Sequence, residues 1–258
     1  MKSIAIVTGA SSGVGQEFLR QLTEGKGGPL DEIWAIARKT EQLEMLAASI
    51  PAPTIRPLSL DLTRNESFES FAALLDAEQP CVQWLINCAG FGTFGNYDAV
   101  GRTNNANMVR LNCLAPVELM SAALPHMRPG SRIINLASIA GAVPQVQLAT
   151  YSATKAFVLE LSRMIDHELA PVGIRVTAVC PKFMRTRFLN KPGNEQVAQR
   201  MCAIGFEDVE RVVTKALRAS LMGRAVCISS LDMKAASLGA KLLPRKLLFR
   251  IEDFLFRS

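Results

Sequence analysis

The chain has 258 residues, of which 49% are hydrophobic, with 29 Lys and Arg against 23 Asp and Glu. This length suits one α/β domain, since such folds often run to roughly 250 residues as a single unit. Only two histidines are present, which makes a His-rich metal site or a Ser-His-Asp hydrolase hard to assemble. Residues 1–180 carry 14 basic and 16 acidic side chains, net −2, whereas residues 181–258 carry 15 and 7, net +8. The basic excess therefore lies in the last third.

Short apolar runs alternate with longer segments of helical periodicity through most of the chain. This alternation is typical of parallel strands joined by crossover helices. It predicts one doubly wound α/β domain over residues 1–230, with a seven-stranded parallel sheet flanked by helices, and a C-terminal helical extension over residues 231–258. The expected strands are 3–7, 32–37, 54–58, 84–87, 132–136, 175–179 and 225–228, and the expected helices are 15–24, 41–49, 65–76, 108–127, 151–170 and 208–222.

The cysteines and the apolar runs bear on where the protein works. The apolar run of residues 4–7 is too short for a signal peptide, and no run approaches the roughly 20 residues of a membrane span. The six cysteines include no CxxC pair and lie mostly in apolar runs, which indicates buried, reduced thiols. We therefore expect a cytoplasmic protein.

A glycine-rich turn follows the first expected strand and opens into the first helix. Glycines in such a turn let the backbone approach a pyrophosphate, whose charge then meets the amides and dipole at the helix N-terminus. Because the required order of strand, turn and helix is met, the turn predicts a dinucleotide site. Its candidate cofactor-binding residues are Thr8, Gly9, Ser11, Ser12, Gly13, Val14 and Gly15.

The residues after the second and third strands bear on which dinucleotide is bound. In this fold an acidic residue after the second strand binds the ribose 2′-hydroxyl, whereas a basic residue accommodates a 2′-phosphate. Ala37 offers no carboxylate and is followed by Arg38 and Lys39, which favours NADP(H), with NAD(H) as the alternative. After the third strand, Asp61 and Leu62 are candidates for the adenine end, although Asp61 is equally well placed to cap the next helix.

A tyrosine and a lysine four residues apart begin one of the expected helices. Tyr151 and Lys155 share a helix face, so a nearby ammonium would stabilise the phenolate. Ser138 follows the strand that ends at Leu136, at the carboxyl edge where doubly wound proteins bind ligands. A Tyr-x-x-x-Lys pair alone is more often structural than catalytic, so the surrounding elements have to supply the specificity.

Together these elements resemble the short-chain dehydrogenase/reductase family. The Thr-Gly-x-x-x-Gly-x-Gly turn is present at residues 8–15, and Asn87-Cys88-Ala89-Gly90 matches the family's Asn-Ala-Gly element apart from its cysteine. Ser138 precedes Tyr151 by 13 residues, as in the family, and Asn112 matches the asparagine of its proton relay. The resemblance implies a Rossmann fold and a dinucleotide-dependent oxidoreductase.

The resemblance covers residues 3 to about 186 and implies a role for each matching residue. Tyr151 would protonate a carbonyl oxygen in reduction, or accept the proton in oxidation, while Lys155 would lower the pKa of the tyrosine and hold the nicotinamide ribose. Ser138 would bind the substrate oxygen, and Asn112 would fix a water that links the lysine to solvent. No metal is required. Further cofactor contacts are implied at Asn87, Ala89, Gly90, Pro181 and Thr186.

One position departs from the family pattern. Its members usually have Pro-Gly after the sixth strand, but this chain has Pro181-Lys182, and we expect the lysine to point outward into water. Residues 182–206 then correspond to the family's substrate lid and mix aromatic, aliphatic and basic side chains. With Phe91 and Phe94, this segment favours an apolar or lipid-like carbonyl or alcohol substrate.

The C-terminal extension carries an amphipathic pattern. From Leu242 onward, Leu243, Leu247, Ile251 and Phe254 follow helical spacing, with arginines and lysines on the opposite side. Such a basic helix can pack on its own subunit, pack on a partner, or lie on an anionic membrane surface. We expect packing on protein first, with peripheral membrane contact as the alternative.

Two functions from different classes are open. The first is an NADP(H)-dependent dehydrogenase or reductase acting on a small carbonyl or alcohol compound. The alternative is a non-catalytic NADP-binding regulator with the same fold. Nucleic-acid binding, which the net charge of +6 suggests, has no recognisable motif to support it. The resemblance also implies a homodimer or homotetramer formed through the helices that carry Asn112 and Tyr151.

Overall fold

The strands are short and rich in branched apolar residues, as the sequence pattern predicts. The structure is a computed structural model, and it describes residues 1–143, 145–184, 205–244 and 246–250. Within this part of the chain the strands are β1 (Ser3–Thr8), β2 (Glu32–Ala37), β3 (Thr54–Ser59), β4 (Cys81–Asn87), β5 (Arg132–Leu136), β6 (Arg175–Cys180) and β7 (Val226–Ile228).

Helical segments alternate with these strands. The α-helices are α1 (Gly13–Thr23), α2 (Glu41–Ser49), α3 (Asn65–Glu78), α4 (Tyr97–Val100), α5 (Arg102–Val109), α6 (Ala115–Ala123), α7 (Ala149–Leu169), α9 (Val209–Leu221) and α10 (Leu231–Leu242). A π-helical turn, η1 (Arg110–Leu114), joins α5 to α6. Short 3₁₀ turns are η2 (Leu124–His126), η3 (Ile139–Gly141) and η4 (Ala170–Val172).

The seven described strands form one sheet in which every neighbouring pair is parallel. The strand order is β3-β2-β1-β4-β5-β6-β7. The order reverses direction between β1 and β4, and doubly wound folds bind ligands beyond the carboxyl ends of the strands at such a point. The predicted doubly wound, seven-stranded parallel fold is confirmed.

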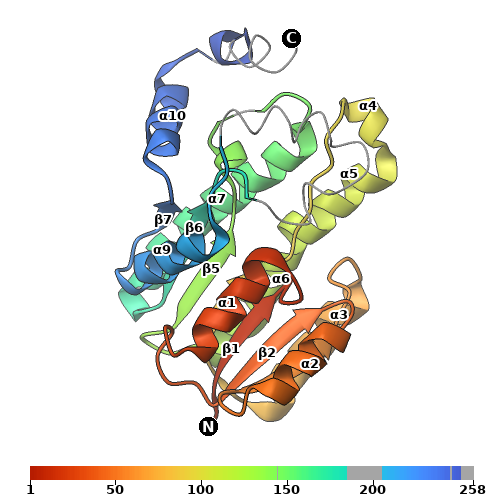
Figure 1. Ribbon diagram of the computed structural model, residues 1–258, viewed down its shortest axis with the longest axis vertical. Coiled ribbons are helices and arrows are strands. Elements are labelled where there is room, and N and C mark those ends of the chain that lie inside the picture. Colours follow the sequence, from red (N-terminus) through yellow and green to blue (C-terminus); the bar gives the residue numbers. More distant parts are fainter. Residues whose placement is uncertain (144, 185–204, 245, 251–258) are drawn as a thin grey trace.

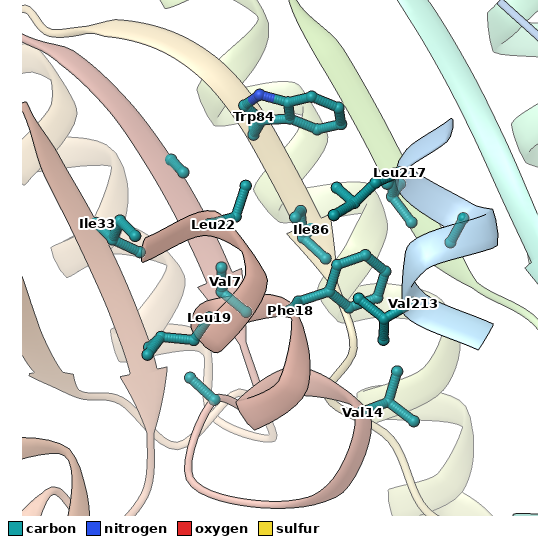
Figure 2. Packing of buried hydrophobic residues seen from close by; sticks show 14 of the residues in the cluster. Val7, Val14, Phe18, Leu19, Leu22, Ile33, Trp84, Ile86, Val213 and Leu217 are labelled. Atoms are coloured by element: carbon teal, nitrogen blue, oxygen red, sulfur yellow. The ribbon is translucent and has the colours of Figure 1, made fainter. Parts of the chain in front are cut away.

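Helices cover both faces of the sheet and create a separate apolar core on each. On one face, α1, α2 and α9 pack over Val7, Ile33 and Ile86. Figure 2 shows Phe18 of α1 pointing toward Val213 of α9 in this layer. On the other face, α3, α6 and α7 pack over a second cluster that contains alternate residues of the same strands. Burial on both faces explains why the strands read as continuous apolar runs.

The helical segment expected at residues 108–127 is longer and less regular than predicted. It begins at Arg102 and passes through the π-helical turn η1 before α6. A π-turn adds a residue to one helical turn, so it changes the direction in which the side chains around it point. Asn112 lies within this turn and is buried.

The C-terminal extension differs from the expectation. The helix α10 lies inside the helical extension expected over residues 231–258, but it begins at Leu231, whereas the expected amphipathic helix begins at Leu242. Of the helix expected from Leu242 onward, residues 246–250 are helical, and residues 251–258 lie outside the described residues. In the part of the chain that the structure describes, no helix is long and apolar enough to span a membrane.

Candidate functional site

The turn between β1 and α1 has a backbone that depends on glycine. Gly9 and Gly13 have φ angles of 65° and 57°, in the left-handed region that favours glycine. A Cβ on Gly15 would lie 2.4 Å from the carbonyl oxygen of Gly9. The tight turn therefore presents backbone rather than side chains at the start of α1, as the approach of a pyrophosphate requires.

The N-terminus of α1 keeps its amides open to a ligand. Ser12 is the N-cap residue, but its side chain makes no capping hydrogen bond. The first amides of an α-helix have no acceptor within the helix, so an uncapped start can bind an anion. Ser11, Ser12 and Gly13 are partly exposed here, whereas Val14 points into the core. This geometry fits a bound pyrophosphate.

Thr8 holds two parts of the site together. Its hydroxyl oxygen accepts hydrogen bonds from the amides of Cys88 and Ala89, at 3.0 and 2.9 Å. A Cβ on Gly9 would lie 3.1 Å from the backbone of Ala89, so the two loops are in direct contact. The Thr8 side chain is buried, and its hydroxyl positions the loop after β4 instead of facing a ligand.

Two exposed cations lie at the end of β2, where the sequence predicts them. Arg38 and Lys39 follow β2 directly. Burial acts to raise the pKa of Asp61, but hydrogen bonds from Thr63 and the nearby charge of Arg38 hold this pKa below its ordinary value. Arg38 therefore lies close enough to Asp61 for its charge to affect the carboxylate.

Asp61 caps a turn, although not the helix itself. Its Oδ1 accepts hydrogen bonds from the amide and the hydroxyl of Thr63, at 3.1 and 2.8 Å. The N-cap of α3 is Arg64, so the carboxylate closes the turn that precedes the helix. Leu62 is buried in the core against α3, with its side chain turned from solvent.

A buried chain of polar side chains runs beneath the loop after β4. Asn87 Nδ2 donates to Asn135 Oδ1 at 2.8 Å, and Asn135 Nδ2 donates to the hydroxyl of Ser162 at 3.0 Å. The chain links β4, β5 and α7. Asn87 Oδ1 is buried without a hydrogen-bond partner among the described residues, so it keeps a free acceptor at the carboxyl edge of the sheet.

Ser138 and Tyr151 meet across the loop after β5. Their side chains share a hydrogen bond, which acts to lower the pKa of the phenol. Ser138 Oγ accepts from the amide of Ala140 at 3.2 Å, which fixes the orientation of its hydroxyl. The amide of Ile139 donates to the carbonyl of Pro181 at 3.0 Å, so the loop is also anchored to the end of β6.

Lys155 brings a buried ammonium to the same place. Its Nζ donates to the carbonyl oxygen of Leu136 at 2.6 Å and lies 5.8 Å from the centroid of the Tyr151 ring. An ammonium has three donors, and Leu136 is the one acceptor recorded for it among the described residues. A buried amine with spare donors fits the hydroxyls of a bound ribose.

Burial dominates the protonation of both groups. It lowers the pKa of Lys155 to about 8, while the Cys88, Cys113 and Cys180 sulfurs act in the opposite direction. It raises the pKa of Tyr151 to about 12, against the hydrogen bond from Ser138. The resemblance implies that Lys155 lowers the pKa of the tyrosine, but burial raises this pKa, because the cost of burying a phenolate outweighs the hydrogen bond from Ser138.

Asn112 holds the backbone of the Phe91 loop. Its Nδ2 donates to the carbonyl of Phe91 at 2.9 Å and to the hydroxyl of Thr154 at 3.0 Å, and its Oδ1 accepts from the amide of Phe91 at 3.0 Å. A Cβ on Gly90 would lie 3.0 Å from Asn112 Oδ1 and 3.5 Å from Lys155 Nζ. Both N–H donors of the Asn112 amide and one lone pair of its oxygen are therefore used within the protein, and the side chain holds the Phe91 loop in place.

Lys182 does not take the outward pose that we expected. Its side chain is 13% exposed, and its Nζ pairs with Asp232 of α10 at 2.8 Å. Its amide donates to Glu207 Oε2 at 2.9 Å, and the Ser229 hydroxyl donates to the same oxygen. The Lys182 ammonium therefore binds the Asp232 carboxylate at the start of α10 instead of water. The sequence pattern did not reveal this acceptor.

Some expected site residues lie outside the part of the chain that the structure describes, and some residues that the structure places in the site were not expected. Thr186 and most of the expected lid, residues 185–204, lie outside the described residues. Conversely, the sequence reasoning missed Thr154, Asn135 and Ser162. Their signal was readable: each is a polar residue on a strand or helix face that is otherwise apolar, where a buried side chain needs a hydrogen-bond partner.

The carboxyl edge of the sheet thus gathers a nucleotide-type turn, a Ser-Tyr pair and a buried lysine. The chain matches the family model described as short chain dehydrogenase over residues 3–197. It therefore belongs to the short-chain dehydrogenase family, whose members are nucleotide-binding oxidoreductases that use NAD(P)(H).

Individual relatives cover different shares of the chain. A probable short-chain type dehydrogenase/reductase of Helicobacter pylori is 26% identical over 239 residues, which are 90% of this chain and 85% of the relative. A very-long-chain 3-oxoacyl-CoA reductase of Emericella nidulans is 30% identical over 183 residues, which are 69% of this chain but 52% of the relative. The match to the fungal protein therefore spans about half of its length.

A solved structure agrees with this fold along nearly the whole chain. The short-chain dehydrogenase from Sphingobium yanoikuyae in complex with NADPH has a TM-score of 0.79 and 27% identity, with 94% of each chain covered.

The buried amine of Lys155 predicts a pH-dependent stability difference. Its pKa is about 8 in the folded protein and about 10.4 in an unfolded chain. Below pH 8 the lysine is charged in both states, so the folded state bears the full cost of burial. Between about pH 8 and 10.4 the folded state has lost the proton while the unfolded state keeps it, so this cost is relieved as the pH rises.

We therefore expect Lys155→Met to be more stable than the natural chain at pH 7, by on the order of 3 kcal/mol. The difference should shrink as the pH rises toward about 10. Urea unfolding of both proteins at several pH values measures it. A difference that stays constant from pH 7 to pH 10 would contradict the buried, depressed amine.

Proposed function

We propose that this chain is an NADP(H)-dependent oxidoreductase that interconverts a carbonyl compound and a secondary alcohol. The observation that carries the proposal is the position of Lys155: a buried ammonium with spare donors lies beside the hydrogen-bonded pair of Ser138 and Tyr151. All three groups stand at the carboxyl edge of the sheet, beside the open N-terminus of α1. This is the place where doubly wound folds bind a dinucleotide.

Each residue has a defined task in this proposal. The bound nicotinamide supplies or accepts the hydride. Tyr151 donates the proton to the carbonyl oxygen during reduction, and Ser138 holds that oxygen by a hydrogen bond. Lys155 uses its spare donors to orient the ribose, and Asn112 fixes the loop that borders the lysine. A phenol with a pKa of about 12 is protonated at neutral pH, so the free protein is prepared for reduction.

The preference for NADP(H) rests on charge at the end of β2. Arg38 and Lys39 are exposed cations, and Ala37 supplies no carboxylate that would repel a 2′-phosphate. The Sphingobium protein, 27% identical, binds NADPH and supports the same choice. NAD(H) is the alternative cofactor. The backbone of the turn at residues 9–15, the loop from Asn87 to Gly90, and Pro181 and Thr186 complete the proposed cofactor contacts.

An apolar, lipid-like substrate agrees with the surroundings of the proposed catalytic groups. Phe91 and Phe94 lie partly exposed on the loop that follows Gly90. The fungal relative acts on a very-long-chain 3-oxoacyl-CoA, which is a carbonyl compound of this type. We also propose that residues 1–230 form the catalytic domain, that residues 231–258 form a helical extension, and that the protein is cytoplasmic, with peripheral membrane association as the alternative.

A homo-oligomer formed through α5, η1 and α7 is part of the proposal. Val109, Phe157 and Met164 are large apolar residues on these helices, and they are 48%, 43% and 56% exposed. Exposed apolar residues on neighbouring helices are typical of an interface between subunits.

The decisive experiment is the substitution Tyr151→Phe, which removes the proposed proton donor but keeps the aromatic ring. We expect kcat for ketone reduction to fall roughly 10²- to 10⁴-fold while the KM for NADPH changes little. Tyr97→Phe is the matched control, because Tyr97 is the chain's other tyrosine and is exposed on α4. Steady-state kinetics on a panel of ketones measures both. If the natural chain binds the cofactor but turns over no substrate, the result would instead favour a non-catalytic NADP-binding regulator.

The substitution Arg38→Ala tests the choice of dinucleotide. We expect KM for NADPH to rise roughly tenfold or more, because a charge-assisted contact with the 2′-phosphate is lost. The KM for NADH serves as the internal control and should not change. An equal effect on both cofactors would show that Arg38 does not recognise the phosphate.

The substitution Met164→Glu tests the subunit interface. A charge placed in an apolar contact between subunits should disrupt the oligomer. Light scattering after size exclusion should then show a smaller assembly, whereas Met45→Glu, on the exposed side of α2, should leave the assembly intact. The proposed interface is wrong if the natural chain is already monomeric.

A further inference from the structure

The helix α10 turns its apolar side away from the protein. Leu231, Leu238 and Leu242 lie on one stripe, because a helix turns once every 3.6 residues, and they are 81%, 61% and 77% exposed. The opposite side of α10 contains Met233, Ala236, Ser237 and Ala240, which are buried or partly exposed. Surface helices normally place their leucines toward the core, so this orientation needs a partner.

The exposed leucines extend into the segment that follows. Figure 1 shows α10 projecting beyond β7, away from the sheet, with the helical residues 246–250 farther out. In that segment Leu247 and Phe249 are 42% and 46% exposed. Leu231, Leu238, Leu242, Leu247 and Phe249 together we call the α10 surface.

The charges around the α10 surface are predominantly positive. Residues 233–250 contain five Lys and Arg and no Asp or Glu. Lys234 is exposed and lies three residues after Leu231 and four before Leu238, so it stands beside the leucine stripe. Lys246 and Arg250 are exposed in the outer segment. The nearest carboxylate on α10, Asp232, is held by Lys182.

This charge selects between the candidate partners. In a twofold contact a second copy would bring the same cations face to face, which is unfavourable in an apolar interface. An anionic lipid surface instead attracts Lys and Arg and receives the leucines between its headgroups. We propose that the α10 surface docks on an anionic membrane surface, with α10 lying in the plane of the interface.

The docked helix is connected to the proposed catalytic edge. Asp232 of α10 pairs with Lys182, and the neighbouring Pro181 accepts a hydrogen bond from the amide of Ile139, which follows Ser138. Docking through α10 therefore fixes the carboxyl edge of the sheet relative to the lipid. This last step rests on the proposed function, since it gives a lipid-like substrate a short path to Ser138 and Tyr151.

Co-sedimentation of the full chain with vesicles tests the docking. We expect binding to phosphatidylcholine vesicles that contain about 30% phosphatidylserine, weak binding to phosphatidylcholine alone, and release at high salt. The double variant Leu238→Glu/Leu242→Glu should bind these vesicles at least about tenfold more weakly than the natural chain.

A second double variant provides the matched control. Leu221→Glu/Met222→Glu adds the same charge at residues that are 51% and 55% exposed. These residues end α9, before β7, whereas α10 follows β7, so the two variants lie at opposite ends of the strand β7. The control should bind vesicles like the natural chain.

The outcomes separate docking from the reaction. Ketone reduction without vesicles should be unchanged in both double variants, which also shows that they fold. Equal vesicle binding by all three proteins overturns the proposal, as does binding that does not depend on phosphatidylserine. If Leu238→Glu/Leu242→Glu instead dissociates an oligomer and the natural chain does not bind vesicles, the α10 surface binds a second copy. If the natural chain binds vesicles but shows no ketone reduction, that result counts against the proposed function and not against the docking.

Discussion

The site depends on keeping one charged amine away from water at the end of β5. Lys155 is buried, and the Leu136 carbonyl at 2.6 Å is its one recorded acceptor among the described residues. Such burial is costly, and the surrounding backbone has to come very close to compensate. A Cβ on Gly141 would lie 2.6 Å from the carbonyl group of Lys155, and one on Gly90 would lie 3.5 Å from its Nζ. The lack of a side chain at these two glycines is therefore as important to the site as the side chains that form it.

The groups that hold the sheet edge differ from those that face a ligand. The Thr8 hydroxyl, the Asn87–Asn135–Ser162 chain and the Asn112 side chain use their hydrogen bonds internally. These groups hold loops in position. Substituting them would shift the site residues, although the groups themselves contact no reactant. Lys155 and the start of α1 keep donors free. A rigid frame with a few unsatisfied groups is what orients a bound molecule without reorganisation.

The sequence predicted the parallel sheet and most element boundaries, since apolar periodicity reports burial directly. It also predicted where Ser138, Tyr151 and Lys155 meet, because strand ends share one edge. It could not predict the raised pKa of Tyr151, which depends on three-dimensional burial. It also placed the amphipathic helix of the extension from Leu242 onward instead of from Leu231, and so did not reveal Asp232 of α10 as the partner of Lys182. Pattern analysis assumes that apolar residues face the core, and α10 breaks that assumption.

The ion pair of Lys182 and Asp232 joins the end of β6 to α10, outside the group of residues that surrounds the Lys155 amine. The groups recorded around the Lys155 amine come from residues 88–180. The lysine that replaces a small residue, its partner on α10 and the basic excess all come later. Substitutions on α10 or around Lys182 can therefore alter the surface of the protein without changing the groups that bury the amine.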